Sequence, residues 1–299
     1  MPTKRHLVFV IHGARAEQPA LRDLVERVRA AGHVVEPRVT WERGDATLYA
    51  SEAARRGVDA VVAVGGDGTV NEVVNGLSGS DVPLGILPFG TANDFARQIG
   101  IPLEPDEAMD VILGRAPVRI DSAELNGRRF LNVSTGGVGA EATAETPLES
   151  KEALGMLAYA ITGVKKLVEL SPRRAYFAGP GFEYRGDFLV FAVGNGRETG
   201  GATALTPRAS VTDGLLDVCI VEGMARAEFA RLVLKLKRGD HLDEPGVRYA
   251  QLAELHVEAQ EPISVNVDGE SSDGFRLRYR SRPRDLHVYA ATLPGEEGG

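Results

Sequence analysis

The sequence predicts two domains, an α/β domain with a parallel sheet followed by a mostly antiparallel β domain. Apolar runs typical of strands alternate with helical patterns up to about residue 119, and a period-2 pattern typical of strands dominates after it. The chain has 299 residues, a length that favours two domains over one. Apolar residues make up 43% and charged residues 25%, which is the balance of a globular protein with a sizeable core.

The first domain consists of strand and helix patterns in turn. Strands are predicted at residues 7–11, 34–40, 58–64 and 82–90, and helices at about 19–31, 45–56, 69–77 and 92–98. This order generates βαβ units and a parallel sheet, which binds its ligands at the carboxyl ends of the strands.

The segment VVAVGGDGTVNEVVNGL, residues 61–77, joins one of these strands to a helix through a glycine-rich loop. Its first four residues have no polar face, as expected of a central strand. Apolar residues recur at helical spacing from Val70 onward. Thr69 and Glu72 fit a capping box, in which a hydroxyl at the N-cap and a carboxylate at N3 bind backbone N–H groups. The glycines therefore lie where the strand ends and the helix begins.

This loop is a candidate phosphate site. Glycine lets the backbone take positive φ and approach a ligand closely, and the N–H groups of a helix start favour an anion. Asp67 would repel a phosphate unless a divalent cation or a reacting hydroxyl lies between them. Taken alone, the two adjacent glycines are more typical of an ordinary tight turn.

The second domain reads as a series of antiparallel strands. RIDSAELNGRRFLNVSTGG, residues 119–137, carries two alternating runs around Asn126 and Gly127, a strong signal for a hairpin. Further strands are predicted within residues 182–196, 255–260, 263–270 and 275–280, and helical insertions near 148–170 and 225–238.

Charge and cysteine content restrict the partners and the compartment. The formal charge of -8 and the lack of a basic run argue against a nucleic-acid partner. Cys219, the single cysteine, lies in the apolar run LLDVCIV, which predicts a buried thiol and suits a reducing cytoplasm. The N-terminal apolar run is too short for a signal peptide, and residues 153–164 fall short of the roughly 20 apolar residues that span a bilayer.

Several familiar catalytic motifs are absent. The sequence contains no G-x-x-x-x-G-K-[ST], no H-E-x-x-H and no G-x-S-x-G. Gly137, Gly139 and Ala142 imitate a dinucleotide fingerprint, but the following YAITGVKK is helical where a second strand with an acidic ribose ligand should end. We therefore do not expect a dinucleotide site there.

Three further patches are candidates for chemistry. LPFGTANDFAR, residues 87–97, places Gly90 and Thr91 after a strand and polar residues at a helix start, where they favour phosphate or ribose binding or simply cap the helix. SVTDGLLDV, residues 210–218, and NVDGE, residues 266–270, each contain Asp-Gly, which is typical of a hairpin turn. NVDGE also carries a second carboxylate just past the turn, where a general base can project from a strand end.

The order of these motifs resembles a known enzyme family. GGDGTVNEVVNGL, then PLGILPFGTANDFAR, and later GNGRETGG, DGLLDV and DGE are similar to the diacylglycerol kinase catalytic family, and in spacing to the bacterial YegS-type lipid kinases. The likeness extends from about Leu7 to the strand after Glu270. GGDGT alone is shared with NAD kinases and, more loosely, phosphofructokinases, so the pair NEVVNGL and GTANDFAR distinguishes the lipid kinases.

The resemblance implies a fold and a reaction. Residues 1–121 would form a three-layer, Rossmann-like domain of the NAD kinase and phosphofructokinase type, to which residues 286–299 would return, and residues 122–285 a β-sandwich. ATP would lie in the cleft between them. The enzyme would transfer the γ-phosphate of ATP, with Mg²⁺, to a hydroxyl of diacylglycerol, phosphatidylglycerol or a related lipid in phospholipid metabolism. We expect a cytoplasmic protein that visits the membrane surface transiently.

The resemblance also implies roles for individual residues. Glu270 would be the general base, and Asp67 and Asp121 would hold Mg²⁺ or orient the nucleophile. The nucleotide pocket would comprise Thr40, Gly65, Gly66, Asp67, Gly68, Thr69, Val70, Asn71 and Thr91. A separate site for Mg²⁺ or Ca²⁺, structural or regulatory, would use the carboxylate of Asp213 with the carbonyls of Ser210 and Leu215.

Two departures and two alternatives stay open. His12 stands where the family often has asparagine, and Ala202 interrupts a glycine triplet. The apolar segment before Lys165 and Lys166 is typical of a core helix and equally of an acyl-chain groove or a bilayer contact. The alternatives are an NAD kinase-like phosphotransferase with a soluble substrate and a non-catalytic nucleotide- or lipid-binding regulator.

Overall fold

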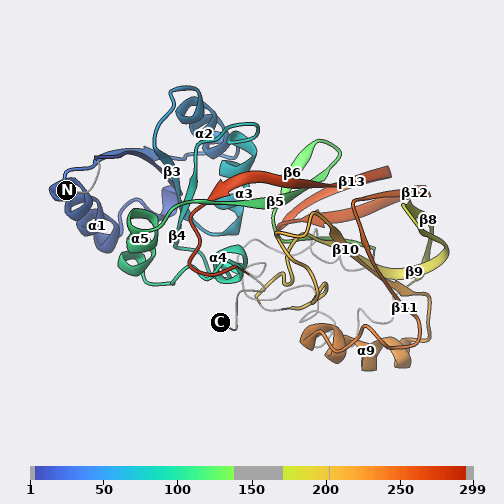
Figure 1. Cartoon of the computed structure of the whole chain (residues 1–299). Coiled ribbons are helices and arrows are strands. Elements are labelled where there is room, and N and C mark those ends of the chain that lie inside the picture. Colours follow the sequence, from blue (N-terminus) through green and yellow to red (C-terminus); the bar gives the residue numbers. More distant parts are fainter. Residues whose placement is uncertain (1–3, 138–170, 202, 294–299) are drawn as a thin grey trace. The chain divides into compact units, whose positions relative to one another are not determined.

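The computed structural model describes residues 4–137, 171–201 and 203–293. The chain divides into two compact units (Figure 1). Unit 1 comprises Met1–Asp121 with Arg284–Gly299, and unit 2 comprises Ser122–Pro283. The chain passes from one unit to the other within strands β5 (Val118–Leu125) and β13 (Glu270–Val288).

Unit 1 contains a parallel sheet in the order β4-β3-β1-β2. Its strands are β1 (His6–Ile11), β2 (Val34–Val39), β3 (Ala60–Gly65) and β4 (Leu84–Pro88). The end of β13 adds a parallel strand beside β4, pairing Val288 with Leu84. Every residue of β3 and β4 is buried, as expected for central strands covered on both faces.

Helices cover both faces of this sheet. α1 (Pro19–Ala30) and α5 (Pro105–Gly114) pack on each other, whereas α2 (Asp45–Arg55) and α3 (Asp67–Gly76) form the second pair. A short 3₁₀ helix, η1 (Gly13–Arg15), and α4 (Asp94–Gln98) lie in the connections. The predicted three-layer α/β arrangement is confirmed, and α5 is a helix that the sequence analysis missed.

The start of α3 corrects one prediction. The helix begins at Asp67 with Gly66 as N-cap, so Thr69 occupies the third helical position and is buried. The Thr69 hydroxyl lies directly beneath Gly65, where an added Cβ would come within 2.4 Å of it. The carboxylate of Glu72 instead accepts a hydrogen bond from the Gly44 N–H at 3.0 Å. The capping box predicted from Thr69 and Glu72 was therefore wrong.

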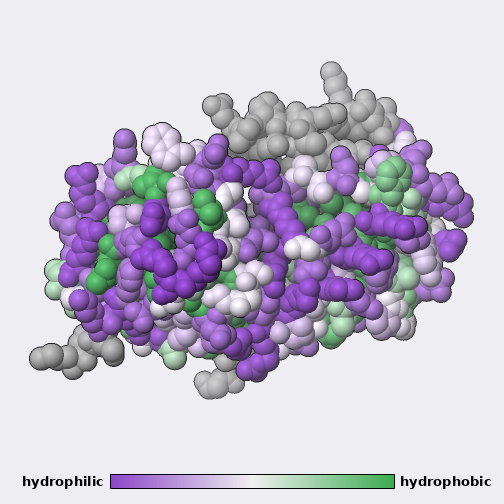
Figure 2. All heavy atoms as spheres, turned by 90° about the horizontal axis from the view of Figure 1, so that it is seen from above, coloured by the Kyte–Doolittle hydropathy of each residue, from purple (hydrophilic) through white to green (hydrophobic). Residues whose placement is uncertain are grey.

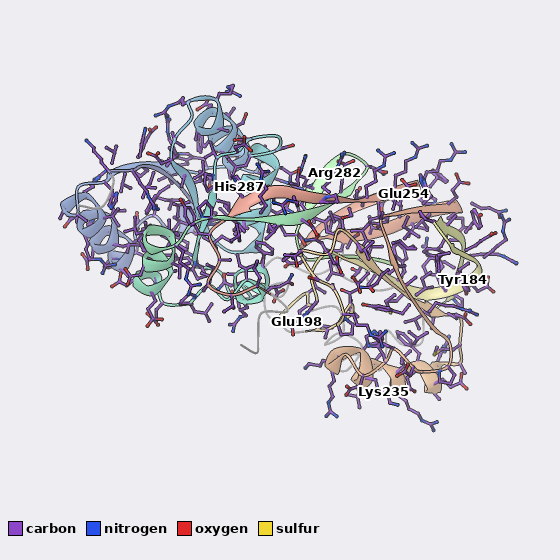
Figure 3. The ribbon with its side chains drawn as sticks, in the orientation of Figure 1. Tyr184, Glu198, Lys235, Glu254, Arg282 and His287 are labelled. Atoms are coloured by element: carbon purple, nitrogen blue, oxygen red, sulfur yellow. The ribbon has the colours of Figure 1, made fainter. Side chains whose placement is uncertain are left out.

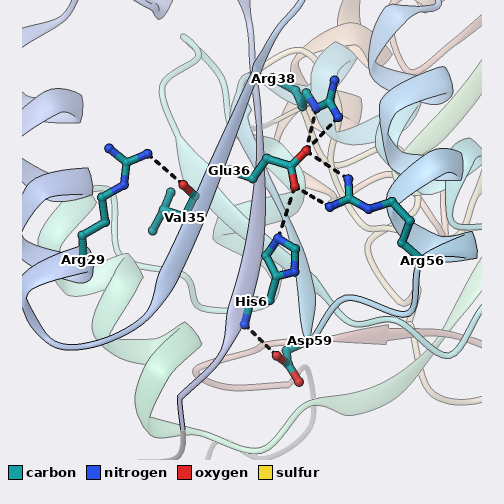
Figure 4. A network of polar contacts seen from close by, with 7 residues as sticks. All are labelled: His6, Arg29, Val35, Glu36, Arg38, Arg56 and Asp59. Atoms are coloured by element: carbon teal, nitrogen blue, oxygen red, sulfur yellow. Dashed lines mark hydrogen bonds and ion pairs between the residues drawn. The ribbon is translucent and has the colours of Figure 1, made fainter.

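An ion-pair network ties the edge of this sheet together (Figure 4). The carboxylate of Glu36 on β2 receives hydrogen bonds from Arg38, from Arg56 just past α2 at 2.6 Å, and from the His6 ring of β1 at 3.2 Å. These donors, with Arg56 first, hold the pKa of Glu36 at about 2, well below its ordinary value.

Unit 2 is built mostly from antiparallel strands in the order β11-β10-β9-β7-β12-β13. β8 pairs with β12 and β9, and β5 pairs with β6. Their bounds are β6 (Arg128–Phe130), β7 (Val133–Gly137), β8 (Arg173–Gly179), β9 (Phe182–Gly194), β10 (Leu216–Glu222), β11 (Val247–Leu252) and β12 (Glu254–Val267).

Two hydrophobic cores lie on the two sides of these strands. One contains Phe177, Phe188, Phe191 and Tyr279, whose rings meet edge to face with centroids 5.3–6.4 Å apart. The other is covered by helix α9 (Arg226–Arg238). The antiparallel architecture expected for the second domain is confirmed.

The burial of the cysteine and the hydrophilic surface are those expected from the sequence of a globular protein. Cys219 is buried in the core under α9, and burial raises the pKa of its thiol to about 12, so the predicted buried thiol is confirmed. Hydrophilic side chains cover most of the face seen in Figure 2. Among the described residues, no helix is long and apolar enough to cross a membrane.

Two predicted turns have the expected geometry. Asn126 and Gly127, with φ of 49° and 92°, link Leu125 to its partner Arg128, and Asp268 and Gly269, with φ of 46° and 90°, close the β12–β13 hairpin. Positive φ at both central residues is typical of a type I′ turn. The predicted helical insertion at 148–170 lies outside the described residues.

Candidate active site

In unit 1, hydrogen bonds join the loops at the carboxyl ends of neighbouring strands. The Thr40 N–H, just past β2, donates to the Ile11 carbonyl of β1 at 2.9 Å, and the Thr40 hydroxyl accepts from the Gly13 N–H at 3.3 Å. The His12 N–H donates to the Val64 carbonyl of β3 at 2.9 Å. The predicted nucleotide residue Thr40 therefore fixes the loop after β1.

The glycine-rich loop after β3 touches the loop after β4 backbone to backbone. The Phe89 N–H donates to the Gly65 carbonyl at 2.9 Å. A Cβ added to Gly90 would lie 2.4 Å from the Gly66 Cα, so neither glycine leaves room for a side chain between the loops. The backbone of Asn93 is in the left-handed conformation, and its side chain accepts from the Gly90 N–H and donates to the Gly90 carbonyl. The GGDGT and GTANDF loops thus lie directly against each other.

Asp67 connects these two motifs through its side chain. Its carboxylate accepts hydrogen bonds from the N–H groups of Asp94 at 3.2 Å and Phe95 at 3.1 Å, the first residues of α4. Each carboxylate oxygen therefore has one backbone donor and keeps acceptor capacity for another group. Asp67 is held in place as a candidate metal ligand beside the first N–H groups of α3.

The remaining predicted nucleotide residues divide into exposed and buried sets. Gly68 and Thr91 are exposed, with no atom within 4 Å of an added Cβ at Gly68. Thr69, Val70 and Asn71 are buried in α3. The exposed part of the loop therefore offers backbone N–H groups and one hydroxyl, the donors that a phosphate binds at a helix start.

Asp121, also in unit 1, is fully buried, and its Oδ1 accepts from the Arg284 N–H at 2.7 Å. This bond joins β5 to β13 where the chain passes between the units. The structure thus gives Asp121 a backbone partner on β13.

In unit 2, Glu270 is the first residue of β13 and forms an ion pair with Arg128. The Glu270 side chain is 18% exposed and the Arg128 side chain 38%, so the pair is reached from solvent chiefly at the arginine. The ion pair holds the carboxylate at the start of the strand, where it is a candidate general base.

Asp268 is a functional neighbour that the sequence analysis missed. It is buried, and its carboxylate accepts from the N–H groups of Leu131 at 2.8 Å and Asn132 at 3.1 Å. The Asn132 carbonyl in turn accepts from the N–H groups of Asn195 and Gly196. NVDGE, FLN and GNG therefore meet in one hydrogen-bonded network that fixes the turn before Glu270. The signal for Asp268 was the first carboxylate of NVDGE, which we assigned only to a turn.

The predicted cation site lies in the tight loop before β10. Asp213 is exposed and its Oδ1 accepts from the Leu215 N–H at 3.0 Å, while the Ser210 hydroxyl contacts that of Thr212 at 3.0 Å. The described residues contain no group of three or more histidine, cysteine or acidic side chains suited to a metal. One carboxylate with two carbonyls remains a donor set that Mg²⁺ or Ca²⁺ accepts, with water completing the shell.

Asp217, the second aspartate of DGLLDV, is buried among polar partners. It accepts from the Tyr249 hydroxyl at 2.5 Å and from the Gln251 amide at 3.3 Å. Burial, with a smaller contribution from the charge of nearby Asp213, raises the pKa of Asp217 to about 6 despite these two donors. The signal in the sequence was a carboxylate inside an apolar strand, which we did not single out.

Comparison with known proteins places these motifs in a family. Residues 6–125 match the model of the diacylglycerol kinase catalytic domain, and residues 132–290 match that of the YegS C-terminal NAD kinase beta sandwich-like domain. Both predicted parts of the fold and the kinase prediction are confirmed by these matches.

Relatives match over nearly the whole chain. A protein of Pseudomonas putida named "Probable lipid kinase YegS-like" is 40% identical over 95% of each chain, and one of Escherichia coli named "Probable lipid kinase YegS" is 39% identical over 93% of this chain and 94% of its own. A crystal structure of a diacylglycerol kinase from Bacillus anthracis is similar with a TM-score of 0.74 at 26% identity, covering 96% of this chain and 98% of that one. The chain therefore belongs to the family of kinases that joins a diacylglycerol kinase catalytic domain to a YegS C-terminal domain.

Proposed function

We propose that this chain transfers the γ-phosphate of ATP to a hydroxyl group of a lipid such as diacylglycerol or phosphatidylglycerol. Family membership and the names of the relatives support the lipid acceptor. The observation that carries the proposal is the Asp67 carboxylate, which joins the GGDGT and GTANDF loops through the backbone of α4. A NAD kinase-like reaction on a soluble substrate and a non-catalytic regulator are outcomes of the test below.

The phosphates of ATP would bind to the loop before α3. Gly66, Gly68 and the first N–H groups of α3 present backbone donors without side-chain obstruction, and the helix dipole favours the negative charge. Thr40 and Thr91 would add hydroxyl donors at either side. Backbone donors suffice because phosphoryl transfer requires positioning and charge stabilisation more than covalent chemistry.

Asp67 and Asp121 are the carboxylates we propose for Mg²⁺ or for orienting the nucleophile. Asp67 fits better, because its two oxygens retain acceptor capacity beside the phosphate loop, whereas Asp121 is buried with a backbone partner. When bound, Mg²⁺ neutralises charge on the phosphates of the nucleotide. The Asp213 loop would hold a second, structural or regulatory cation.

Glu270 would act as the general base. Its carboxylate would take the proton of the lipid hydroxyl while the hydroxyl oxygen forms a bond to the γ-phosphorus and the bond from phosphorus to the leaving ADP oxygen breaks. The ion pair with Arg128 would orient this carboxylate, and the Asp268 network fixes the turn that carries it. The protein supplies no covalent nucleophile in this scheme.

The test is transfer of labelled γ-phosphate from ATP with Mg²⁺ to lipid alcohols in mixed micelles, with NAD as a parallel acceptor. Glu270→Gln should lower turnover by about 10²- to 10⁴-fold, the usual contribution of a general base, and leave ATP affinity nearly unchanged. Glu258→Gln, at an exposed glutamate on β12, is the matched control and should retain full turnover.

Each outcome distinguishes one reading from the others. Label in a lipid that disappears in Glu270→Gln supports both the acceptor and the base. Unchanged turnover in Glu270→Gln would remove Glu270 from this role. Label in NAD instead of lipid would show that the acceptor is the soluble nucleotide and not a lipid. ATP binding without transfer to any acceptor would indicate a regulator.

A further inference from the structure

Helix α9 has one buried face and one exposed face. Phe229, Leu232, Val233 and Leu236 repeat at helical spacing and pack into the core formed with β9 and β10. Arg231, Leu234, Lys235 and Arg238 repeat the same spacing two residues later, about 200° around the helix, and all four are exposed. We call this second set the outer face of α9.

The outer face is strongly basic in an acidic chain. α9 carries five basic residues, namely Arg226, Arg231, Lys235, Lys237 and Arg238, and one acidic residue, Glu228. The whole chain has a formal charge of -8. Glu228 is used at the helix start, where it accepts from the Ala225 N–H. The cations of the outer face therefore have no acidic counterpart on the helix itself.

Local structure explains only part of this charge. Lys235 forms an ion pair with Glu244, and cations in the last turn are favoured by the helix dipole. Arg231 lies two turns from the helix end, beyond the reach of that effect. Among the described residues, neither Arg231 nor Arg238 forms an ion pair. Asp240 and Asp243 follow only after Gly239, which ends the helix in a left-handed conformation.

Leu234 adds an apolar group at the centre of the basic face. Its side chain is 56% exposed, one of few large hydrophobic residues in the described part of unit 2 with such exposure. A single exposed leucine is ordinary, but one surrounded by Arg231, Lys235 and Arg238 combines an apolar contact with positive charge. Figure 3 shows Lys235 and its neighbouring side chains projecting from α9 away from the strands.

We propose that the outer face of α9 docks on the surface of an anionic lipid bilayer. Each Arg or Lys near an anionic membrane adds electrostatic attraction to the lipid headgroups. A leucine between these cations can insert its side chain at the boundary of the acyl chains. A nucleic acid would use the cations but leave Leu234 without a partner. The inference rests on the proposed lipid kinase function only to explain why docking would be useful to the enzyme. Bilayer binding itself is measured without any reaction.

The experiment is sedimentation of the full chain with phosphatidylcholine vesicles that contain or lack phosphatidylglycerol. We expect binding only to the anionic vesicles, weakening as salt screens the charges. Arg231→Gln with Arg238→Gln should weaken vesicle binding about 25-fold, that is about fivefold for each cation. Leu234→Ala should weaken it further without changing the salt dependence.

Arg174→Gln with Arg185→Gln is the matched control, since it removes two exposed arginines from β8 and β9 of the same unit. It should retain binding, and melting curves should show all variants folded. Equal binding to both kinds of vesicle, or an equal loss in the control, would overturn the inference. The inference would also be overturned if the protein bound a DNA duplex as tightly as the anionic vesicles and if Leu234→Ala left the DNA affinity unchanged.

The micelle assay separates this inference from the proposed function. Lipid phosphorylation in micelles without binding to anionic vesicles would refute the docking surface and leave the kinase reaction standing. Vesicle binding that depends on the outer face of α9, without phosphorylation of any lipid, would support the docking surface and refute the proposed kinase reaction.

Discussion

At the scale of single residues, Asp217 shows how burial changes the chemistry of a carboxylate. Its side chain lies in the interior of unit 2 with two neutral donors, Tyr249 and Gln251, and no ion pair with a described residue. Its pKa rises from the usual 3.8 to about 6 as a result. The folded protein therefore binds more protons than the unfolded chain between these values, and stability falls as pH rises through this range.

Asp217→Asn should remove the fall in stability that accompanies ionisation of the buried carboxyl group as pH rises. Asparagine keeps an acceptor for the Tyr249 hydroxyl and carries no charge to bury. Above pH 6 we expect the variant to be more stable than the parent by about 1–3 kcal/mol, and near pH 4 the two should converge. Denaturant unfolding across this pH range measures the effect, with exposed Asp243→Asn as control. A parent protein whose stability does not fall between these pH values would contradict the assignment.

Asp268 and Glu270 illustrate two carboxylates of one short motif with different tasks. Asp268 is buried and satisfied by the N–H groups of Leu131 and Asn132, whereas Glu270 is partly exposed and paired with Arg128. Asp268→Ala should therefore lower stability by about 1–3 kcal/mol, because two buried N–H groups lose their acceptor. Thermal melting measures this loss, and Glu270→Gln should melt within about 1 kcal/mol of the parent. A Glu270→Gln protein as unstable as Asp268→Ala would give Glu270 a structural role instead.

At the scale of elements, the contact between the loops after β3 and β4 depends on the absence of side chains. Gly90→Ala would place a Cβ 2.4 Å from the Gly66 Cα and 2.7 Å from the Asn93 Oδ1. The loops must separate to accommodate it, so we expect a loss of about 1–3 kcal/mol in stability together with weaker ATP binding. Calorimetry and a nucleotide titration test both effects.

Gly68→Ala is the matched control for stability. Nothing lies within 4 Å of an added Cβ there, and alanine is the better helix former. This variant should melt at or above the parent temperature, although its new methyl group lies in the loop proposed for phosphate binding. Equal melting temperatures for Gly90→Ala and the parent would show that the two loops are free to separate.

The Glu36 network couples β1, β2 and the end of α2. Because the pKa of Glu36 is depressed to about 2, the ionised carboxylate stabilises the fold above its ordinary value near 4.5, and this stabilisation is lost as pH falls toward 2. Glu36→Gln should cost about 1 kcal/mol at neutral pH, since solvent screens much of the attraction to Arg38 and Arg56. The difference from the parent in urea unfolding should shrink with added salt and on acidification, and exposed Glu17→Gln should show no such difference.

At the scale of the whole molecule, nucleotide binding should stabilise the protein. A ligand that binds only the folded state adds about 2.7 kcal/mol at 100 times its Kd. A non-hydrolysable ATP analogue with Mg²⁺ should therefore raise the melting temperature in a saturable way, whereas NAD should raise it much less. Asp213→Asn should preserve this rise, because Asp213 is proposed for a separate structural or regulatory cation and not for the phosphate loop. An equal rise with NAD would favour the NAD kinase-like alternative.

Much of the architecture was predictable because strand and helix patterns are local. Continuous apolar runs predicted β3 and β4, and two Asx-Gly pairs predicted hairpins that the structure contains. The missed helix α5 begins at Pro105 with no side-chain cap, and α3 starts earlier than predicted because Gly66 serves as N-cap where a hydroxyl was expected. Both errors arose at helix starts, where tertiary packing overrides local preference.

The sequence by itself determined the alternation of strands and helices, the glycine-rich loop between a strand and a helix, and the family, because these depend on residues close together along the chain. Only the tertiary structure decided which distant groups meet: Asp67 with the backbone of α4, Glu270 with Arg128, Asp268 with Leu131 and Asn132, and the opposed faces of α9. Burial of a polar group becomes favourable only when a partner is supplied, and that partner comes from a segment that only folding brings near.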